Sequence, residues 1–164
     1  MTATANDWGR LCELLDDDAE LAAEVRLAAD DPEEYFRRHE DRLADRGIES
    51  PDETDPWLAL IDGLDDVGAL AYLDWKDTGA EVAQALAGVP RVVRAGIDLD
   101  AVEDIDDLEA AVAHADRLLA GSGLRVVYLE EDSDAYPLVV VPSAHAAEII
   151  EISARLGYEA RTFG

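Results

Sequence analysis

The chain has 164 residues, 49% of them hydrophobic, and its 39 acidic residues outnumber its 13 basic ones to give a net charge of −26. This charge argues against a protein that binds nucleic acid or an anionic membrane surface, because both are bound through clustered lysine and arginine. No stretch approaches the roughly 18 apolar residues of a membrane span, and the N-terminal segment has no basic head followed by an apolar run. We therefore expect a cytoplasmic protein without a leader or a membrane span.

The first part of the chain, residues 1–66, is predicted to be a helical segment. Apolar residues recur at helical spacing over residues 8–25. Asp31 and Asp55, each followed by a proline, predict two further helix starts, because aspartate caps helices well and proline suits the first helical position. The lone cysteine, Cys12, lies on the apolar face of the first helix, which predicts a small buried side chain rather than a disulfide.

From residue 69 the pattern changes from helical to mixed. The run ALAYLDW at residues 69–75 predicts a strand. Thr78 and Glu81 have the spacing of a capping box and predict that a helix follows. Residues 89–104 are interpreted as a connector with at most a short strand at 91–94.

The strongest local signal is a β-hairpin at residues 124–142, where two β-rich runs flank an acidic, turn-prone stretch. Asp106 and Glu109 predict the start of a helix before the hairpin. Ser143 predicts the start of another helix after it, and the run YEARTF at residues 158–163 predicts a terminal strand.

The order of these elements over residues 69–164 is strand, helical segment, strand, strand, helix, strand, which is the βαββαβ order of a ferredoxin-like sheet. We therefore predict an α+β fold in which residues 1–164 form a single domain. The predicted strand order is 4-1-3-2, with the strand at 69–75 in the middle and the helices of this part on one sheet face. The N-terminal helices are expected to cover the other face or an edge.

One short pattern points to catalysis. Asp52 preceded by a proline, and later Asp74 two positions before Lys76, the only lysine, match the written signature of a superfamily of metal-dependent nucleases. On a strand, Asp74 and Lys76 would share a face, where a carboxylate can ligate a divalent cation and a lysine can stabilise charge. However, about a quarter of the residues are acidic, bases are scarce, and Asp52 precedes a helix rather than lying on a neighbouring strand. The alternative is that Lys76 forms an ion pair with a nearby carboxylate.

The acidity itself has three explanations: a solvated surface, a face that meets a basic partner, or a polycarboxylate metal site. The clearest surface feature is the predicted hairpin tip, where Glu130, Glu131, Asp132 and Asp134 form a candidate acidic contact loop. This loop lacks the central glycine and the terminal glutamate of an EF-hand calcium loop.

Two segments resemble a bacterial family of uncharacterised proteins, a domain of unknown function. They are PWLALIDGLDDVGALAYLDWKD and VVYLEEDSDAYPLVVVPSAHAAEIIEISARLGYEARTF, which together carry a Trp-Leu pair, an Asp-Trp-Lys segment and a C-terminal hairpin, helix and strand. The resemblance covers roughly residues 55–164 and supplies no enzyme activity. It implies that Trp57, Asp74, Trp75 and Lys76 mark a shared structural or functional patch.

These observations favour a non-enzymatic interaction or regulatory module, of the immunity type, that binds a basic protein and needs no cofactor or metal. The sequence has no nucleophile elbow, phosphate-binding loop or glycine-rich dinucleotide turn, and its histidines do not have metal-ligand spacing. The alternative is a metal-dependent phosphodiester hydrolase that uses Asp74 and Lys76.

Overall fold

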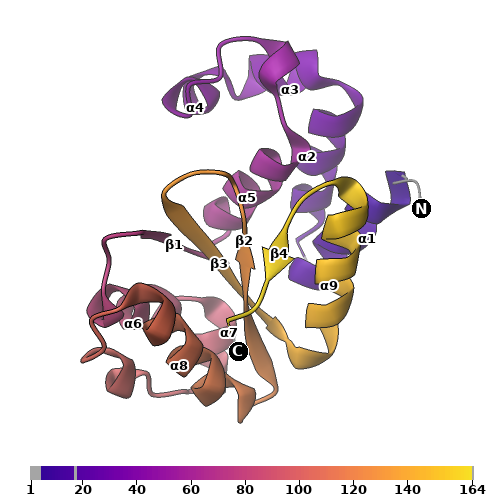
Figure 1. The fold of residues 1–164 in the computed structure, drawn as a ribbon. Coiled ribbons are helices and arrows are strands. Elements are labelled where there is room, and N and C mark those ends of the chain that lie inside the picture. Colours follow the sequence, from indigo (N-terminus) through magenta and orange to yellow (C-terminus); the bar gives the residue numbers. More distant parts are fainter. Residues whose placement is uncertain (1–4, 17, 164) are drawn as a thin grey trace.

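The computed structural model describes residues 5–16 and 18–163, and Figure 1 shows their fold. Residues 1–4, which belong to the N-terminal stretch where we looked for a leader, lie outside the described residues. The described α-helices are α1 (Ala5–Leu15), α2 (Ala19–Asp30), α3 (Pro32–Arg38), α4 (Glu40–Asp45), α5 (Pro56–Asp66), α6 (Gly79–Ala87), α7 (Pro90–Ala95), α8 (Leu108–Ala120) and α9 (Ser143–Leu156). Short 3₁₀ helices are η1 (Pro51–Glu53) and η2 (Asp100–Val102). The strands are β1 (Leu70–Asp74), β2 (Leu124–Leu129), β3 (Ala135–Pro142) and β4 (Ala160–Arg161).

The strands form one antiparallel sheet whose two faces are both covered by helices (Figure 1). Successive residues of a strand point to opposite faces. On β3, Val139 and Val141 pack in the cluster that contains α1, α5 and α9. Leu138 and Val140 pack in the cluster that contains α6, α7 and α8. The molecule therefore has three layers, helix, sheet and helix, which confirms the α+β class, and Cys12 is buried in the first cluster as predicted.

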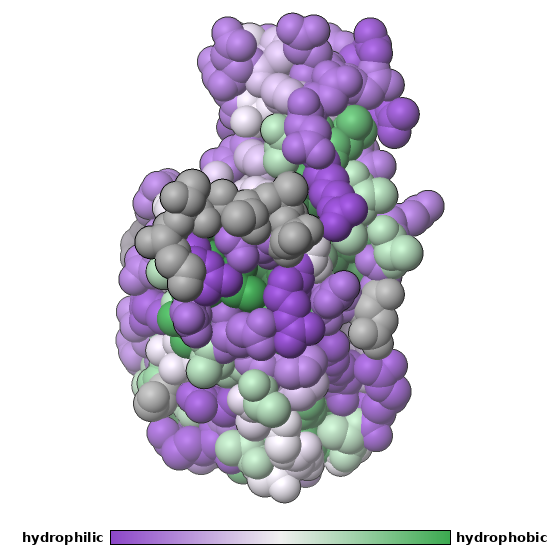
Figure 2. Space-filling model, turned by 90° about the vertical axis from the view of Figure 1, so that its right-hand side faces the viewer, coloured by the Kyte–Doolittle hydropathy of each residue, from purple (hydrophilic) through white to green (hydrophobic). Residues whose placement is uncertain are grey.

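The surface over α1 and α9 is mainly hydrophilic. Figure 2 shows this side, where the described hydrophobic residues appear as small separate areas. No helix in the described part of the chain is long and apolar enough to cross a bilayer.

The predicted ferredoxin-like strand order is wrong. The observed order is β1-β3-β2-β4, so β1 lies at an edge of the sheet instead of in the middle, and β4 pairs with β2 instead of β1. The first three strands do have the predicted neighbours, with β3 between β1 and β2. Only the place of the last strand differs.

The prediction that the helices of residues 69–164 lie on one sheet face is also wrong, because α9 lies on the other face. The handedness of the chain crossovers explains its place. The crossovers from β1 to β2 and from β3 to β4 each pass over one strand, and both advance in the same direction across the sheet. They start from antiparallel strands, so two right-handed crossovers place their helices on opposite faces. Accordingly, α8 packs with α6, whereas α9 packs with α1 on the other face. The N-terminal helices supply the apolar surface against which α9 is buried.

Most local predictions are confirmed. The Asp31 and Asp55 side chains accept hydrogen bonds from the first turns of α3 and α5. Thr78 forms the predicted capping box with Glu81 at the start of α6. The helix before the hairpin is capped by Asp107, close to the predicted start.

Residues 91–94 are wrongly predicted as a connector with at most a short strand, because they lie in α7. Pro90 starts this helix and Gly96, in the left-handed region at φ 66°, ends it, so both signals of a short helix are present in the sequence.

A helical arm, which we define as α3 and α4, extends away from the sheet above α2 and α5 (Figure 1). The sequence predicts one helix here, but the chain breaks at His39, whose Nε2 lies 2.8 Å from Glu24 Oε2 on α2. Tyr35 and Leu43 form a small core of the arm with Ala59 of α5. Polar contacts add to this small core in attaching the arm to α2 and α5.

Candidate functional site

The predicted patch around Asp74 and the predicted acidic contact loop lie at the same end of the sheet. The register of β1 and β3 places Asp74 opposite Ala135, next to the hairpin loop. One position further on, the backbone N–H of Trp75 donates to the carbonyl of Asp134 at 3.0 Å. The segment after β1 and the acidic loop therefore form one continuous surface.

Trp57 belongs to the interior beneath this surface. It is 1% exposed, and its indole N–H donates to the carbonyl of Glu130 at 2.7 Å. Its ring stacks on Tyr158 with centroids 4.8 Å apart, and the Tyr158 hydroxyl donates to Asp55 at 2.6 Å. Trp57 thus ties α5 to the hairpin loop and to the C-terminal segment, and it cannot contact a partner directly.

Trp75 and Lys76 lie in an exposed turn after β1. Because the strand ends at Asp74, the prediction that Asp74 and Lys76 share a strand face is wrong. The cause is Asp77, whose carboxylate accepts the Asp74 N–H at 2.8 Å and whose own N–H donates to the Asp74 carbonyl, which closes a turn. Trp75 is 55% exposed, and Lys76 Nζ lies 5.5 Å from its ring centroid. Among the described residues, Lys76 therefore makes a cation–π contact in place of the ion pair that we expected.

The four acids of the candidate contact loop have different environments. Asp132 and Asp134 are exposed. Glu130 is half-buried and accepts the N–H of Asp132 at 3.3 Å. The Glu131 side chain is only 3% exposed and points into the molecule. Two of the four acids therefore remain available at the surface.

We call the residues that are exposed at this end of the sheet the hairpin-end surface, and they are Asp74, Trp75, Lys76, Asp132 and Asp134. A hollow of 490 Å³ adjoins it, at the start of α8. The hollow is lined by Trp75, Lys76, Asp77, Asp106, Asp107, Leu108, Glu109 and Tyr136. An exposed tryptophan is thus bordered by carboxylates, and the sequence identified this tryptophan as a site candidate but gave the acids at the start of α8 no role beyond starting the helix.

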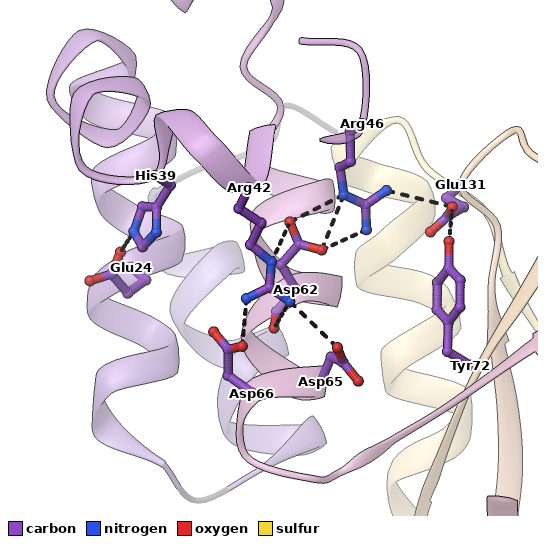
Figure 3. Close-up of polar contacts among 9 residues, drawn as sticks. All are labelled: Glu24, His39, Arg42, Arg46, Asp62, Asp65, Asp66, Tyr72 and Glu131. Atoms are coloured by element: carbon purple, nitrogen blue, oxygen red, sulfur yellow. Dashed lines mark hydrogen bonds and ion pairs between the residues drawn. The ribbon is translucent and has the colours of Figure 1, made fainter. Parts of the chain in front are cut away.

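A buried ion-pair cluster lies between the helical arm and the sheet (Figure 3). Asp62 on α5 is 6% exposed and accepts hydrogen bonds from Arg46, at 3.1 Å from Nε and 2.6 Å from Nη2. Arg42 Nε lies 3.5 Å from the same carboxylate. Burial alone lowers the pKa of Arg46, but the hydrogen bond and the charge of Asp62 outweigh it and raise that pKa above its ordinary value. The cluster therefore joins the end of the arm to α5 through ion pairs.

Glu131 extends this cluster to the sheet. Its Oε2 accepts hydrogen bonds from the hydroxyls of Tyr72 at 2.6 Å and Ser133 at 2.8 Å, and it lies 3.6 Å from Arg46. Burial, and then the hydrogen bond to Glu131, raise the pKa of Tyr72 to about 12. Glu131 Oε1 is buried and has no hydrogen-bond partner among the described residues. Such an oxygen is costly to leave unpaired, so this position favours a further donor.

Sequence reasoning missed this cluster, although one signal was present. Asp62 is the only charged residue in the run PWLALIDGL, and it falls between Ile61 and Leu64 on the buried side of α5. An acid within an apolar helical stripe indicates a buried partner, but the sequence does not say that the partner is Arg46.

The residues of the nuclease pattern do not assemble into one site. Asp52 lies on η1, ahead of α5, and not on a strand beside β1. Within residues 5–16 and 18–163, no group of three or more His, Cys, Asp or Glu side chains has the geometry to hold a metal ion.

Comparison with known proteins gives one match. The model of a family described as a domain of unknown function, DUF6630, matches residues 7–163, a longer stretch than the resemblance over residues 55–164 indicated. No curated protein and no solved structure matches the chain.

Proposed function

Since the chain belongs to the DUF6630 family, whose function is unknown, its activity has to be inferred from its own surface, and we propose that it is a non-enzymatic module that binds a basic protein. The observation that carries this proposal is the exposed Trp75 on the hairpin-end surface, with carboxylates on several sides. Tryptophan is among the residues enriched at the energetic centre of protein interfaces. Carboxylates around it select a partner of opposite charge.

The contact between Lys76 and Trp75 supports a cationic side chain as the group that this surface binds. Lys76 Nζ already lies over the indole ring, where the ring quadrupole attracts a cation. A lysine or arginine of a partner can take the same position while its neighbours pair with Asp74, Asp132 or Asp134. A regulatory or immunity-type antagonist works in this way, by covering a basic surface of its target, and we include that class in the proposal.

The test is affinity capture from a native lysate of the source organism, with elution by increasing NaCl. We expect the captured protein to be basic and to elute as salt rises, because the Debye length falls from about 10 Å at 0.1 M to about 3 Å at 1 M. The variant Trp75→Ala should weaken binding of that protein about 30-fold, the effect of a hot-spot residue.

A matched pair of charge variants separates a local site from general acidity. Asp74→Asn, Asp132→Asn and Asp134→Asn, made together, remove three charges from the hairpin-end surface, and capture should be lost. Glu20→Gln, Asp30→Asn and Glu33→Gln remove three exposed charges from α2 and α3, and capture should persist. Equal loss in both triple variants, or capture that is insensitive to salt, would contradict the proposal.

The hydrolase alternative has less support. It requires Asp74 and Lys76 to act together on a metal-bound phosphodiester, but Lys76 lies over Trp75 in a turn and Asp52 lies on a separate 3₁₀ helix. Its test is whether Mg²⁺ or Mn²⁺ raises the melting temperature, since a bound ion stabilises the folded state through linkage.

A further inference from the structure

On the outer edge of β1, some backbone groups point away from the rest of the sheet. In an antiparallel pair, hydrogen-bonded and non-bonded positions alternate along the strand. The bond from Trp75 N–H to Asp134 places Leu73 and Ala71 at bonded positions with β3, so Leu70, Tyr72 and Asp74 direct their N–H and C=O groups away from β3.

Asp77 satisfies both backbone groups of Asp74. Among the described residues, no group bonds the outward N–H and C=O of Tyr72. β1 is also the terminal strand of the sheet, so at Tyr72 this edge offers a backbone donor and a backbone acceptor to another chain.

The exposed hydrophobic surface of the described residues gathers along the same edge. The large hydrophobic residues that are exposed are Val67 (38%), Tyr72 (47%), Trp75 (55%) and Val93 (61%). Val67 precedes β1, Tyr72 lies in it, and Trp75 follows it. Val93 lies on α7, from which Arg91 and Arg94 line a cavity of 240 Å³ together with Val67 and Ala69. The opposite side of the molecule, over α1 and α9, is mainly hydrophilic (Figure 2).

An acidic pocket borders this edge. A cavity of 260 Å³ separates β1 from α4 and α5, and Leu70 and Tyr72 form its sheet side. The charged residues in or beside it are Arg42, Asp45, Arg46, Asp62, Asp65, Asp66 and Glu131. Five are acidic and two are basic, and both arginines are held in ion pairs. The edge therefore has carboxylates at both ends, in this pocket and at the hairpin-end surface.

We propose that the partner binds through an extended basic segment that adds a strand to the outer edge of β1. This inference rests on the proposed function and adds the binding geometry. The segment bonds the outward N–H and C=O of Tyr72, packs apolar side chains on Tyr72 and Trp75, and places lysine or arginine near Asp65 at one end and Asp134 at the other. A second copy of this chain is disfavoured as the occupant, because each copy has a net charge of −26.

The experiment uses the full chain and a random library of peptides of about nine residues, long enough to span one strand. The protein first selects peptides from the library, and the selected peptides should be enriched in lysine and arginine. Amide hydrogen exchange of ¹⁵N-labelled protein is then measured by NMR with and without a selected peptide. We expect exchange of the Tyr72 amide to slow at least about tenfold in the complex, because its N–H becomes hydrogen-bonded.

A matched pair of variants gives a second readout. Tyr72→Ala and Tyr72→Pro both remove the side chain, but only proline removes the outward N–H, which is a position where an edge strand tolerates proline. With both variants shown to be folded by circular dichroism, Tyr72→Pro should lose at least about tenfold more affinity for the selected peptide than Tyr72→Ala, the equivalent of one hydrogen bond.

The outcomes separate the two proposals. Basic peptides that bind without slowing the Tyr72 amide would overturn strand addition and leave the proposed function intact. Selection of peptides that are not basic would overturn both. A protected Tyr72 amide in the free protein, together with a dimer mass by sedimentation, would show that a second copy occupies the edge and would also overturn the inference.

Discussion

At the scale of single residues, Asp62 holds the helical arm to the body of the molecule. Its carboxylate is almost fully buried and accepts hydrogen bonds from Arg46, while Arg42 lies close by. We predict that Asp62→Ala lowers the free energy of unfolding by about 3 kcal/mol, because it leaves the largely buried Arg46 guanidinium with only the more distant Glu131 as its counter-charge. Urea denaturation followed by circular dichroism measures this change.

The matched control is Asp65→Ala, one turn away on the same helix. Asp65 is 56% exposed in its side chain and lies 3.5 Å from Arg42, so its removal should change stability by less than about 1 kcal/mol. A similar loss in both variants would mean that the buried contact of Asp62 has no special weight.

Trp57 is predicted to act through stability and not through contact with a partner. Trp57→Phe keeps an aromatic ring against Tyr158 but removes the N–H that bonds the Glu130 carbonyl. We expect a loss of about 1–3 kcal/mol in the free energy of unfolding, because a buried carbonyl loses its donor. Below the melting transition, capture of the basic protein should remain as strong as in the wild type, and a selective loss of capture in a fully folded variant would contradict this assignment.

At the scale of elements, the junction of β1 and α6 depends on one glycine. A Cβ on Gly79 would lie 1.9 Å from the carbonyl oxygen of Val102 and 2.6 Å from that of Ile105, and the Gly79 N–H donates to Ile105 at 2.7 Å. Both neighbours are backbone atoms and cannot turn aside. Gly79→Ala should therefore cost about 3 kcal/mol or more through overpacking, measured as a lower urea midpoint.

Gly121, at the end of α8, is the control for that substitution. It has ordinary helical φ and ψ, and its nearest neighbour to an added Cβ is the Leu118 carbonyl oxygen at 3.6 Å. Gly121→Ala should stabilise the protein by about 0.5 kcal/mol, because alanine restricts the unfolded chain. Destabilisation of both variants by the same amount would show that the close approach at Gly79 is relieved cheaply.

At the scale of the whole molecule, the tyrosines make the free energy of unfolding fall as pH rises in the alkaline range. Burial comes first among the causes that raise the pKa of all five tyrosines, Tyr35, Tyr72, Tyr128, Tyr136 and Tyr158, and neighbouring carboxylates add to it. The folded state therefore keeps protons that the unfolded state releases above pH 10. The sign follows from linkage: this contribution is fully present below about pH 10 and is lost as pH rises through the folded pKa values, which for Tyr72 is about 12.

The measurement is the ultraviolet absorbance of tyrosinate during an alkaline titration, with circular dichroism in parallel. We expect tyrosinate to appear only well above pH 10, together with unfolding. An absorbance rise centred near pH 10 in a protein that stays folded would contradict the predicted shifts.

Local structure was predictable from the sequence, whereas the sheet topology was predictable only in part. The caps at Asp31, Asp55 and Thr78 and the hairpin were predictable because each is set within a few residues of chain. The place of β4 was not predictable, because a strand of two residues carries little pairing preference of its own. Its position depends on which face buries α9, and that depends on helices more than a hundred residues earlier.

The candidate site was likewise predictable in part, since its exposed residues were identified from sequence but its buried contacts were not. Trp75 and the acidic hairpin tip were identified as candidates from sequence, and the register of β1 with β3 brings them together. Glu131 was placed at the surface by composition, yet it is buried against Tyr72, 59 positions away in the chain. Acidity along the sequence says nothing about which carboxylates point inward.

By itself, the sequence determined the helix starts at Asp31, Asp55 and Thr78, the hairpin, the α+β class and the excess of negative charge, since these depend on composition and on neighbours within a few positions. Only the tertiary structure decided that β1 is an open edge, that α9 lies on the face of the N-terminal helices, and that Asp62 and Glu131 are buried partners of Arg46. The physical reason is that these features are contacts between distant segments, and their free energy depends on surfaces that exist only after the layers have packed together.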